Sequence, residues 1–157
     1  MKIFIGTDHA GFGLKEKLVP FLTSLGYEVV DMGAHEYVED DDFPDYIIPV
    51  AREVSMHPNE VKGIILGGTG QGEAMCANKF KNVRATVYYG NAGSIVEDKE
   101  SIIKLSKEHN NANILSLGAR FITEDQMTNV VKEWLSAPFS GDERHIRRIS
   151  KMDNIHE

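Results

Sequence analysis

Short apolar runs alternate along the chain with longer segments in which apolar residues recur at helical spacing. The short runs predict buried parallel strands, because each is followed by a segment long enough for a crossover helix. The five predicted strands cover residues 2–6, 27–32, 61–66, 83–88 and 112–117. This alternation predicts a three-layer α/β sandwich with a five-stranded parallel sheet, whose strand order the pattern does not specify.

The predicted helices lie between these strands and after the last one. They cover about 14–25, 44–56, 99–108 and 142–152, and two more begin at the glycine-rich turn 67–72 and after Thr123. Gly26 is the expected C-cap of the first helix and Thr123 an expected N-cap, while Pro20 is expected to kink the first helix. The polar stretch from Tyr89 to about Glu100 predicts a loop or lid.

Length and charge limit what the chain can be. Its 157 residues suit a single domain covering 1–157, and its formal charge of −7 argues against nucleic acid or an anionic membrane as the main partner. A single cysteine, Cys76, excludes an intrachain disulfide and suits the cytoplasm. We expect no signal peptide, because residues 1–6 run straight into the first strand with no cleavage site. The six histidines show no metal-binding spacing, so we expect no metal.

The most informative stretch joins the third predicted strand to the next helix through the glycine-rich segment 67–72. Backbone N–H groups at such a turn and helix start attract an anion. A Walker A loop would need Lys and Ser or Thr after the last glycine, where this chain has Glu73 and Ala74. The third glycine of a dinucleotide-binding fingerprint is replaced by Met75.

Glu73 places a carboxylate at the mouth of this anion site, where it would repel a permanent phosphate. A better occupant is an oxyanion that exists only during the reaction. It would form when Glu73 removes a proton from a carbon atom, and the N–H groups of the turn would stabilise it. The turn therefore favours an enolising enzyme. The alternative interpretation is that Glu73 only caps the helix.

Further polar residues follow other predicted strands. Asp8 and His9 end the first strand and Arg120 follows the fifth, so all reach the carboxyl edge of a parallel sheet, where ligands bind. Taken alone, Asp8 and His9 could be a helix cap beside a surface histidine. The acidic run 39–42 is most simply a solvated loop.

Arg144 and Arg148 share one face of the last predicted helix, which suggests an anion site in an otherwise acidic chain. The alternative is pairing of these arginines with Asp142 and Glu143. His109 and Asn110 could be only a polar helix exit, and Cys76 a small core residue.

Four motifs occur in a characteristic order. They are Asp8-His9-Ala10-Gly11 with Leu14-Lys15, Gly67 to Glu73 with Ala77-Asn78-Lys79, His109-Asn110 with Asn113 and Arg120, and Arg144 with Arg148. Together they resemble the type B ribose-5-phosphate isomerase family, which is grouped with the galactose-6-phosphate isomerase subunits. The resemblance covers nearly the whole chain and implies a Rossmann-like fold and a homodimer or a dimer of dimers.

The resemblance also implies residue roles in interconverting ribose 5-phosphate and ribulose 5-phosphate, a reaction of the pentose phosphate pathway. Some family members use a Cys base and others a Glu, and this chain looks like the Glu type. The implied catalytic residues are Glu73 as base, Thr69 for hydroxyl protons, and Asp8 or His109 for ring opening. The implied binding residues are Gly68, Gly70 and Gly72 for the enediolate, Tyr46 and Asn110 for the sugar, and His9, Arg120, Arg144 and Arg148 for the phosphate.

In that family the histidine and arginine side of the pocket comes from the partner subunit, so helix 142–153 is expected to reach a second copy. No cofactor is implied. The connection between Arg84 and His109 is longer than in typical members of the family, with 90–98 as the extra segment. The length and stereochemistry of the sugar substrate are therefore not specified. An isomerase of allose or galactose 6-phosphate and a non-catalytic sugar-phosphate binder therefore remain alternatives. A phosphorylated receiver domain is disfavoured, because Gly67-Gly68-Thr69 stands where its acceptor Asp would lie.

Overall fold

The computed structural model of the chain describes residues 1–90 and 101–155. Within these ranges a five-stranded, all-parallel sheet has the order β2-β1-β3-β5-β4. The strands are β1 (Lys2–Thr7), β2 (Glu28–Asp31), β3 (Val61–Gly67), β4 (Ala85–Tyr88) and β5 (Ile114–Gly118). The helices are α1 (Phe12–Ser24), α2 (Phe43–Met56), α3 (Gln71–Ala77), α4 (Ile102–Asn110), α5 (Glu124–Ser136) and α6 (Glu143–Asp153).

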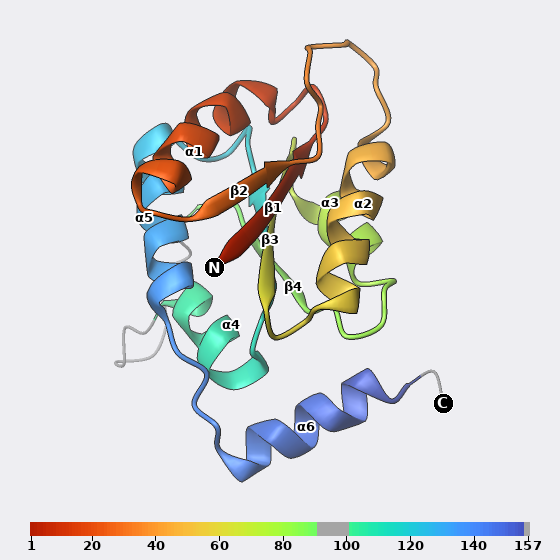
Figure 1. The fold of residues 1–157 in the computed structure, drawn as a ribbon, viewed down its shortest axis with the longest axis vertical. Helices are drawn as coiled ribbons and strands as arrows, with labels where there is room; N and C mark the ends of the chain where they lie inside the picture. The colour runs from red at the N-terminus through yellow and green to blue at the C-terminus, as the bar shows by residue number, and fades with distance from the viewer. Residues whose placement is uncertain (91–100, 156–157) are drawn as a thin grey trace.

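Helices cover both faces of the sheet, as the alternating pattern predicts (Figure 1). Helices α1, α4 and α5 lie on one face, where the largest core cluster includes Leu18, Ile103 and the fully buried Trp134. Helices α2 and α3 lie on the other face, around Ile47 and Val50. The predicted three-layer sandwich is therefore confirmed.

Most predicted elements are present with small shifts at their ends. The fourth strand begins at Ala85 rather than at residue 83, and the fifth runs to Gly118. Helix α1 passes through Pro20 without ending there, and Gly26 follows it with a positive φ of 86°. Thr123 caps α5 in a capping box with Gln126, which confirms the expected N-cap. The predicted lid, beyond Gly90, lies largely outside the described residues.

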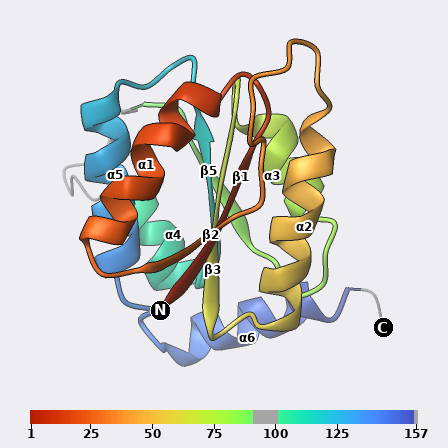
Figure 2. The same cartoon turned by 45° about the horizontal axis from the view of Figure 1, so that its top comes forward.

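The two edges of the sheet carry different elements. The carboxyl ends of the strands lie at the top of Figure 1, with the loops that follow β1, β2 and β3, whereas α6 runs beneath the amino ends (Figures 1 and 2). Helix α6 is joined to the body near the end of α4 and through an ion pair between Arg84 and Asp153. No helix in the described ranges is long and apolar enough to span a membrane.

Candidate active site

Strands β1, β3 and β5 end side by side and bring three loops together at the carboxyl edge. The end of β1 supplies Asp8 and His9, the end of β3 supplies the glycine-rich loop, and the end of β5 supplies Arg120. The chain links these loops directly, since the N–H groups of Ala119 and Arg120 donate to the carbonyl oxygens of Gly67 and Gly68 at 2.8 and 3.1 Å. This juxtaposition was predicted from the strand ends.

The glycine-rich loop is held in a conformation that suits few other residues. Gly70 has a φ of 74° and precedes α3, and a Cβ at Gly70 would lie 3.0 Å from the backbone of β5. The fully buried Ser116 donates its hydroxyl to the Gly70 carbonyl at 2.6 Å. Sequence reasoning missed Ser116, because only the pairing of β3 with β5 places it beneath the loop.

Glu73 occupies the space left by a missing side chain. A Cβ on Gly67 would come within 1.8 Å of Glu73 Oε1, so the carboxylate lies against the Gly67 backbone. The residue is only 5% exposed, and its Oε2 has no hydrogen-bond partner in the described part of the chain. Burial raises the pKa of this carboxyl, its own N–H opposes the rise, and nearby Asp8 adds to it.

The other predicted residues of this loop face the same region. Thr69 Oγ1 accepts a hydrogen bond from the Gln71 N–H at 3.2 Å. The Arg120 guanidinium lies over Gly68, where an added Cβ would be 3.4 Å from its Cζ. Phe43 at the start of α2 packs against Gly72 in the same way, at 3.2 Å. The glycines thus allow Arg120, which follows β5, and Phe43 of α2 to approach the loop closely.

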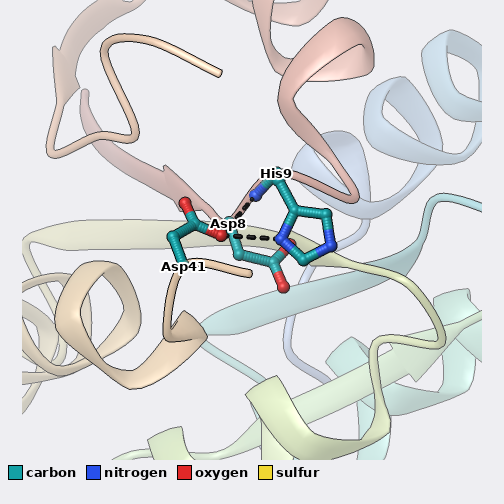
Figure 3. Close-up of side chains that lie close together, drawn as sticks. All are labelled: Asp8, His9 and Asp41. Carbon is teal, nitrogen blue, oxygen red and sulfur yellow. Dashed lines mark hydrogen bonds and ion pairs between the residues drawn. The ribbon is translucent and has the colours of Figure 1, made fainter. Parts of the chain in front are cut away.

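Asp41 contradicts the expectation that the acidic run 39–42 is only a solvated loop. Its neighbours Asp40 and Asp42 are exposed, but the Asp41 side chain is only 7% exposed. One oxygen, Oδ1, accepts from the His9 backbone N–H at 3.0 Å and lies 2.7 Å from His9 Nδ1 (Figure 3). Tyr46 lies beside Asp41. Burial raises the pKa of the Tyr46 phenol, and the hydrogen bond to the Asp41 carboxylate raises it further.

The predicted histidine and arginine ligands lie at the opposite edge. His109 and Asn110 end α4 just before β5 begins, and Arg144 and Arg148 are exposed on α6. The chain therefore does not bring these four residues to Glu73. Their expected role in the site of a partner subunit stays a prediction.

His145, on α6, is buried beneath these ligands and was not among the predicted site residues. Its ring lies 4.4 Å from the His109 ring, and its Nδ1 is 2.7 Å from Ser140 Oγ. Burial lowers the pKa of His145, and His109 and Arg144 lower it further. Arg144 also pairs loosely with Asp142, at 3.7 Å, so the alternative of local charge pairing holds in part.

One cluster in the described ranges has the composition of a metal site. Asp8, His9 and Asp41 offer ligand atoms that all lie within 4.8 Å of one another. The direct bond between His9 Nδ1 and Asp41 already accounts for the closeness of these two residues. Cys76 is half-buried on α3, and burial raises the pKa of its thiol, which disfavours a reactive thiolate.

The chain is similar to known proteins along nearly its whole length. Ribose-5-phosphate isomerase B of Mycolicibacterium paratuberculosis is 36% identical over 149 residues, covering 95% of this chain and 87% of that protein. A crystal structure of ribose-5-phosphate isomerase B from Mycoplasma genitalium with bound ribulose-5-phosphate has a TM-score of 0.88 and 36% identity, covering 97% of this chain and 93% of that one. The Clostridium thermocellum ribose-5-phosphate isomerase B structure has a TM-score of 0.86 and 40% identity, over 99% and 97% of the two chains. Residues 3–152 match the ribose/galactose isomerase family, and the chain belongs to that family.

Proposed function

We propose that the protein interconverts ribose 5-phosphate and ribulose 5-phosphate as an aldose–ketose isomerase with Glu73 as its base. Family membership and the likeness to a relative with bound ribulose-5-phosphate support the reaction. The choice of Glu73 depends on one observation, a buried carboxylate beside the glycine-rich loop whose Oε2 has no hydrogen-bond partner among the residues that the structure describes. A glutamate that served only as a helix cap would have its oxygens on solvent or backbone N–H groups.

The environment of Glu73 suits proton transfer from carbon. Burial raises the pKa of its carboxyl, which increases the affinity of the carboxylate for a proton. Glu73 removes the proton from C2 of the open-chain aldose, and the electron pair moves to O1, giving a cis-enediolate. The proton then returns to C1, while the hydroxyl proton on O2 moves to O1 with the help of Thr69. One well-placed N–H donor to the enediolate oxygen contributes roughly 3–4 kcal/mol, and Gly68, Gly70 and Gly72 supply candidates.

The residues that bind the phosphate and open the sugar ring would come from both ends of the sheet. His9 and Arg120 lie at the carboxyl edge, and a second copy would supply His109, Asn110, Arg144 and Arg148 from its α4 and α6. Either Asp8 or His109 opens the furanose ring. Helix α6 suits such a contact, because it has exposed apolar residues, Ile146 and Met152, beside its arginines. The working unit is then a homodimer, or a tetramer built from two such dimers.

No metal or cofactor is required by this chemistry, because the acid, the base and the oxyanion donors all belong to the protein. The cytoplasm is the compartment we assign, since sugar phosphates are intracellular metabolites and the single Cys76 requires no oxidising environment.

The experiment is an isomerisation assay in EDTA with ribose 5-phosphate, allose 6-phosphate and galactose 6-phosphate. We expect the pentose to be preferred. Glu73→Gln should lower kcat at least about 10³-fold while inorganic phosphate still inhibits with unchanged affinity. The control Cys76→Ser should keep full activity. Turnover by Glu73→Gln, or loss of turnover in EDTA, would contradict the proposal, and preference for a hexose would transfer it to that substrate.

A further inference from the structure

Asp41 makes a contact with His9 that exceeds an ordinary surface ion pair. The same oxygen accepts from the backbone N–H of His9 and lies within 2.7 Å of its ring Nδ1. Two bonds from one residue to one buried oxygen fix both the position and the plane of the ring. In Figure 3 the other ring nitrogen, Nε2, lies on the far side of the ring from Asp41. The His9 side chain is 22% exposed, so it is open to a ligand.

The charges around His9 come from three separate loops. The hydrogen bond to Asp41 raises the pKa of the His9 imidazole, burial opposes this, Asp8 adds to the rise, and Arg120 lowers it. Uncharged groups near the pair include the Tyr37 ring, which meets the His9 ring edge to face with 6.2 Å between centroids, and the Tyr46 hydroxyl beside Asp41. Two carboxylates thus oppose one guanidinium at this ring.

Protonation decides what His9 can do for a phosphate. When neutral with its Nδ1–H donated to Asp41, the ring presents a lone pair at Nε2, which repels a phosphate oxygen. When protonated, the same nitrogen donates a charge-assisted hydrogen bond and adds a positive charge beside Arg120.

We propose that Asp41 is a positioning residue that holds His9 as an imidazolium with its Nε2–H available to the phosphate group of the substrate. The proposal deepens the proposed function and rests on it for the identity of the substrate. Asp41 contacts His9 directly, through both hydrogen bonds to its Oδ1. It acts by keeping His9 cationic at a pH where a histidine of ordinary pKa is largely neutral.

The direct test is an NMR titration of the His9 ring nitrogens in the free protein, with the signal assigned by its loss in His9→Gln. The informative variant is Asp41→Asn, because an amide oxygen still accepts both hydrogen bonds but has no charge. The matched control is Asp40→Asn, which removes the same charge from the exposed neighbouring residue. We expect the His9 pKa to fall in Asp41→Asn and to be unchanged in Asp40→Asn.

Kinetics provide the second readout. In Asp41→Asn we expect KM for ribose 5-phosphate to rise about tenfold at pH 7.5, with kcat within about twofold and KM close to wild type at pH 6. A purely structural role would change kcat and KM at both pH values. An unchanged KM at pH 7.5, or an unchanged His9 pKa, would overturn the proposal.

Failure of the proposed function would look different from failure of this inference. If none of the sugars is turned over, inorganic phosphate should still raise the His9 pKa in the wild type, and the His9 pKa of Asp41→Asn should lie below that of the wild type with and without phosphate. If Asp41→Asn does not fold, the wild-type titration alone decides, because a neutral His9 at pH 7 would overturn the proposal. Broadening of the His9 signal by micromolar Zn²⁺, with loss of the bond to Asp41, would replace it with a metal site.

Discussion

The position of the Glu73 carboxylate depends on the absence of a side chain at Gly67. This carboxylate fills the position that a side chain at Gly67 would occupy, so Gly67 is required for space rather than for backbone freedom. No positive φ is involved, because Gly67 is the last residue of β3. The need for this space explains why the apolar strand β3 ends in a glycine.

Gly67→Ala should consequently disable the enzyme without unfolding it. The new Cβ would overlap the Glu73 carboxylate and displace it, and a displacement of about 1 Å at a reacting group can cost about 100-fold in rate. We expect at least that loss in kcat, measured together with thermal unfolding. Gly13→Ala is the control, because an added Cβ there meets nothing within 4 Å. Full activity in Gly67→Ala would show that Glu73 is not the base.

The buried charge of Glu73 also affects stability in a pH-dependent way. Because burial raises its pKa, the folded state binds more protons than the unfolded chain between the ordinary value of 4.5 and the raised value. The contribution of Glu73 is therefore present below pH 4.5 and is lost as pH rises through that window.

Glu73→Gln should thus become more stable than the wild type as pH increases. Each unit of pKa shift corresponds to about 1.4 kcal/mol in the free energy of unfolding. The measurement is denaturant unfolding of both proteins at pH 4 and pH 8, with equal stability expected at the lower pH. The same difference in unfolding free energy between the two proteins at pH 4 and at pH 8 would mean that the Glu73 carboxylate is hydrated in solution.

The residues of the site differ in how far sequence reasoning could find them. Asp8, His9, Glu73 and Arg120 follow predicted strands, so their meeting at one edge could be inferred from a parallel sheet. Asp41 could not be separated from its acidic neighbours, because only the tertiary path of the loop buries it against His9. Ser116 was hidden in the same way, as a polar residue inside an apolar strand.

At the scale of elements, helix α6 has little packing against the core, although it carries two of the proposed phosphate-binding residues. It carries Arg144 and Arg148, lies outside the two main core clusters, and buries only His145. Its C-terminal end is fixed by Arg84, whose Nη1 donates to both oxygens of Asp153 at 3.2 and 3.0 Å. The sequence predicted a charged helix over 142–152 but gave no sign of this contact, which joins residues 69 positions apart.

Asp153→Asn should loosen this end of α6. The Arg84 guanidinium would then have no counter-charge from α6 while it remains near Lys62 and Lys107, whose pKa values it already helps to lower after burial. We expect a loss of about 1–3 kcal/mol in unfolding free energy and a higher KM, with kcat changed less. The control is Lys151→Gln on an exposed position of the same helix. A lower stability with unchanged KM would restrict Asp153 to a structural role.

At the scale of the whole molecule, the fold separates the two halves of the proposed site. The order of the strands, which no local pattern encodes, puts β3 at the centre and its glycine-rich loop at one edge. Helix α4 lies beside the amino-terminal half of the sheet, so His109 at its end lies far from the loop that precedes α3 (Figure 1). In the proposed arrangement the site is therefore completed by a second copy, and a symmetric pair would complete two sites at once.

Mixing two inactive variants tests this arrangement directly. In a dimer of one Glu73→Gln chain and one His109→Ala chain, one site has both substitutions and the other has neither. Because random reassortment makes about half of the dimers mixed, and each mixed dimer has one intact site of two, the mixture should regain about a quarter of wild-type activity. The measurement is activity after dissociation in mild denaturant and joint refolding, against each variant refolded alone. Glu73→Gln mixed with Thr69→Ala is the control, since both residues belong to the same loop and no mixed dimer has an intact site. Recovery in the first mixture alone would establish a shared site, whereas equal activity in both mixtures would mean that each chain works by itself.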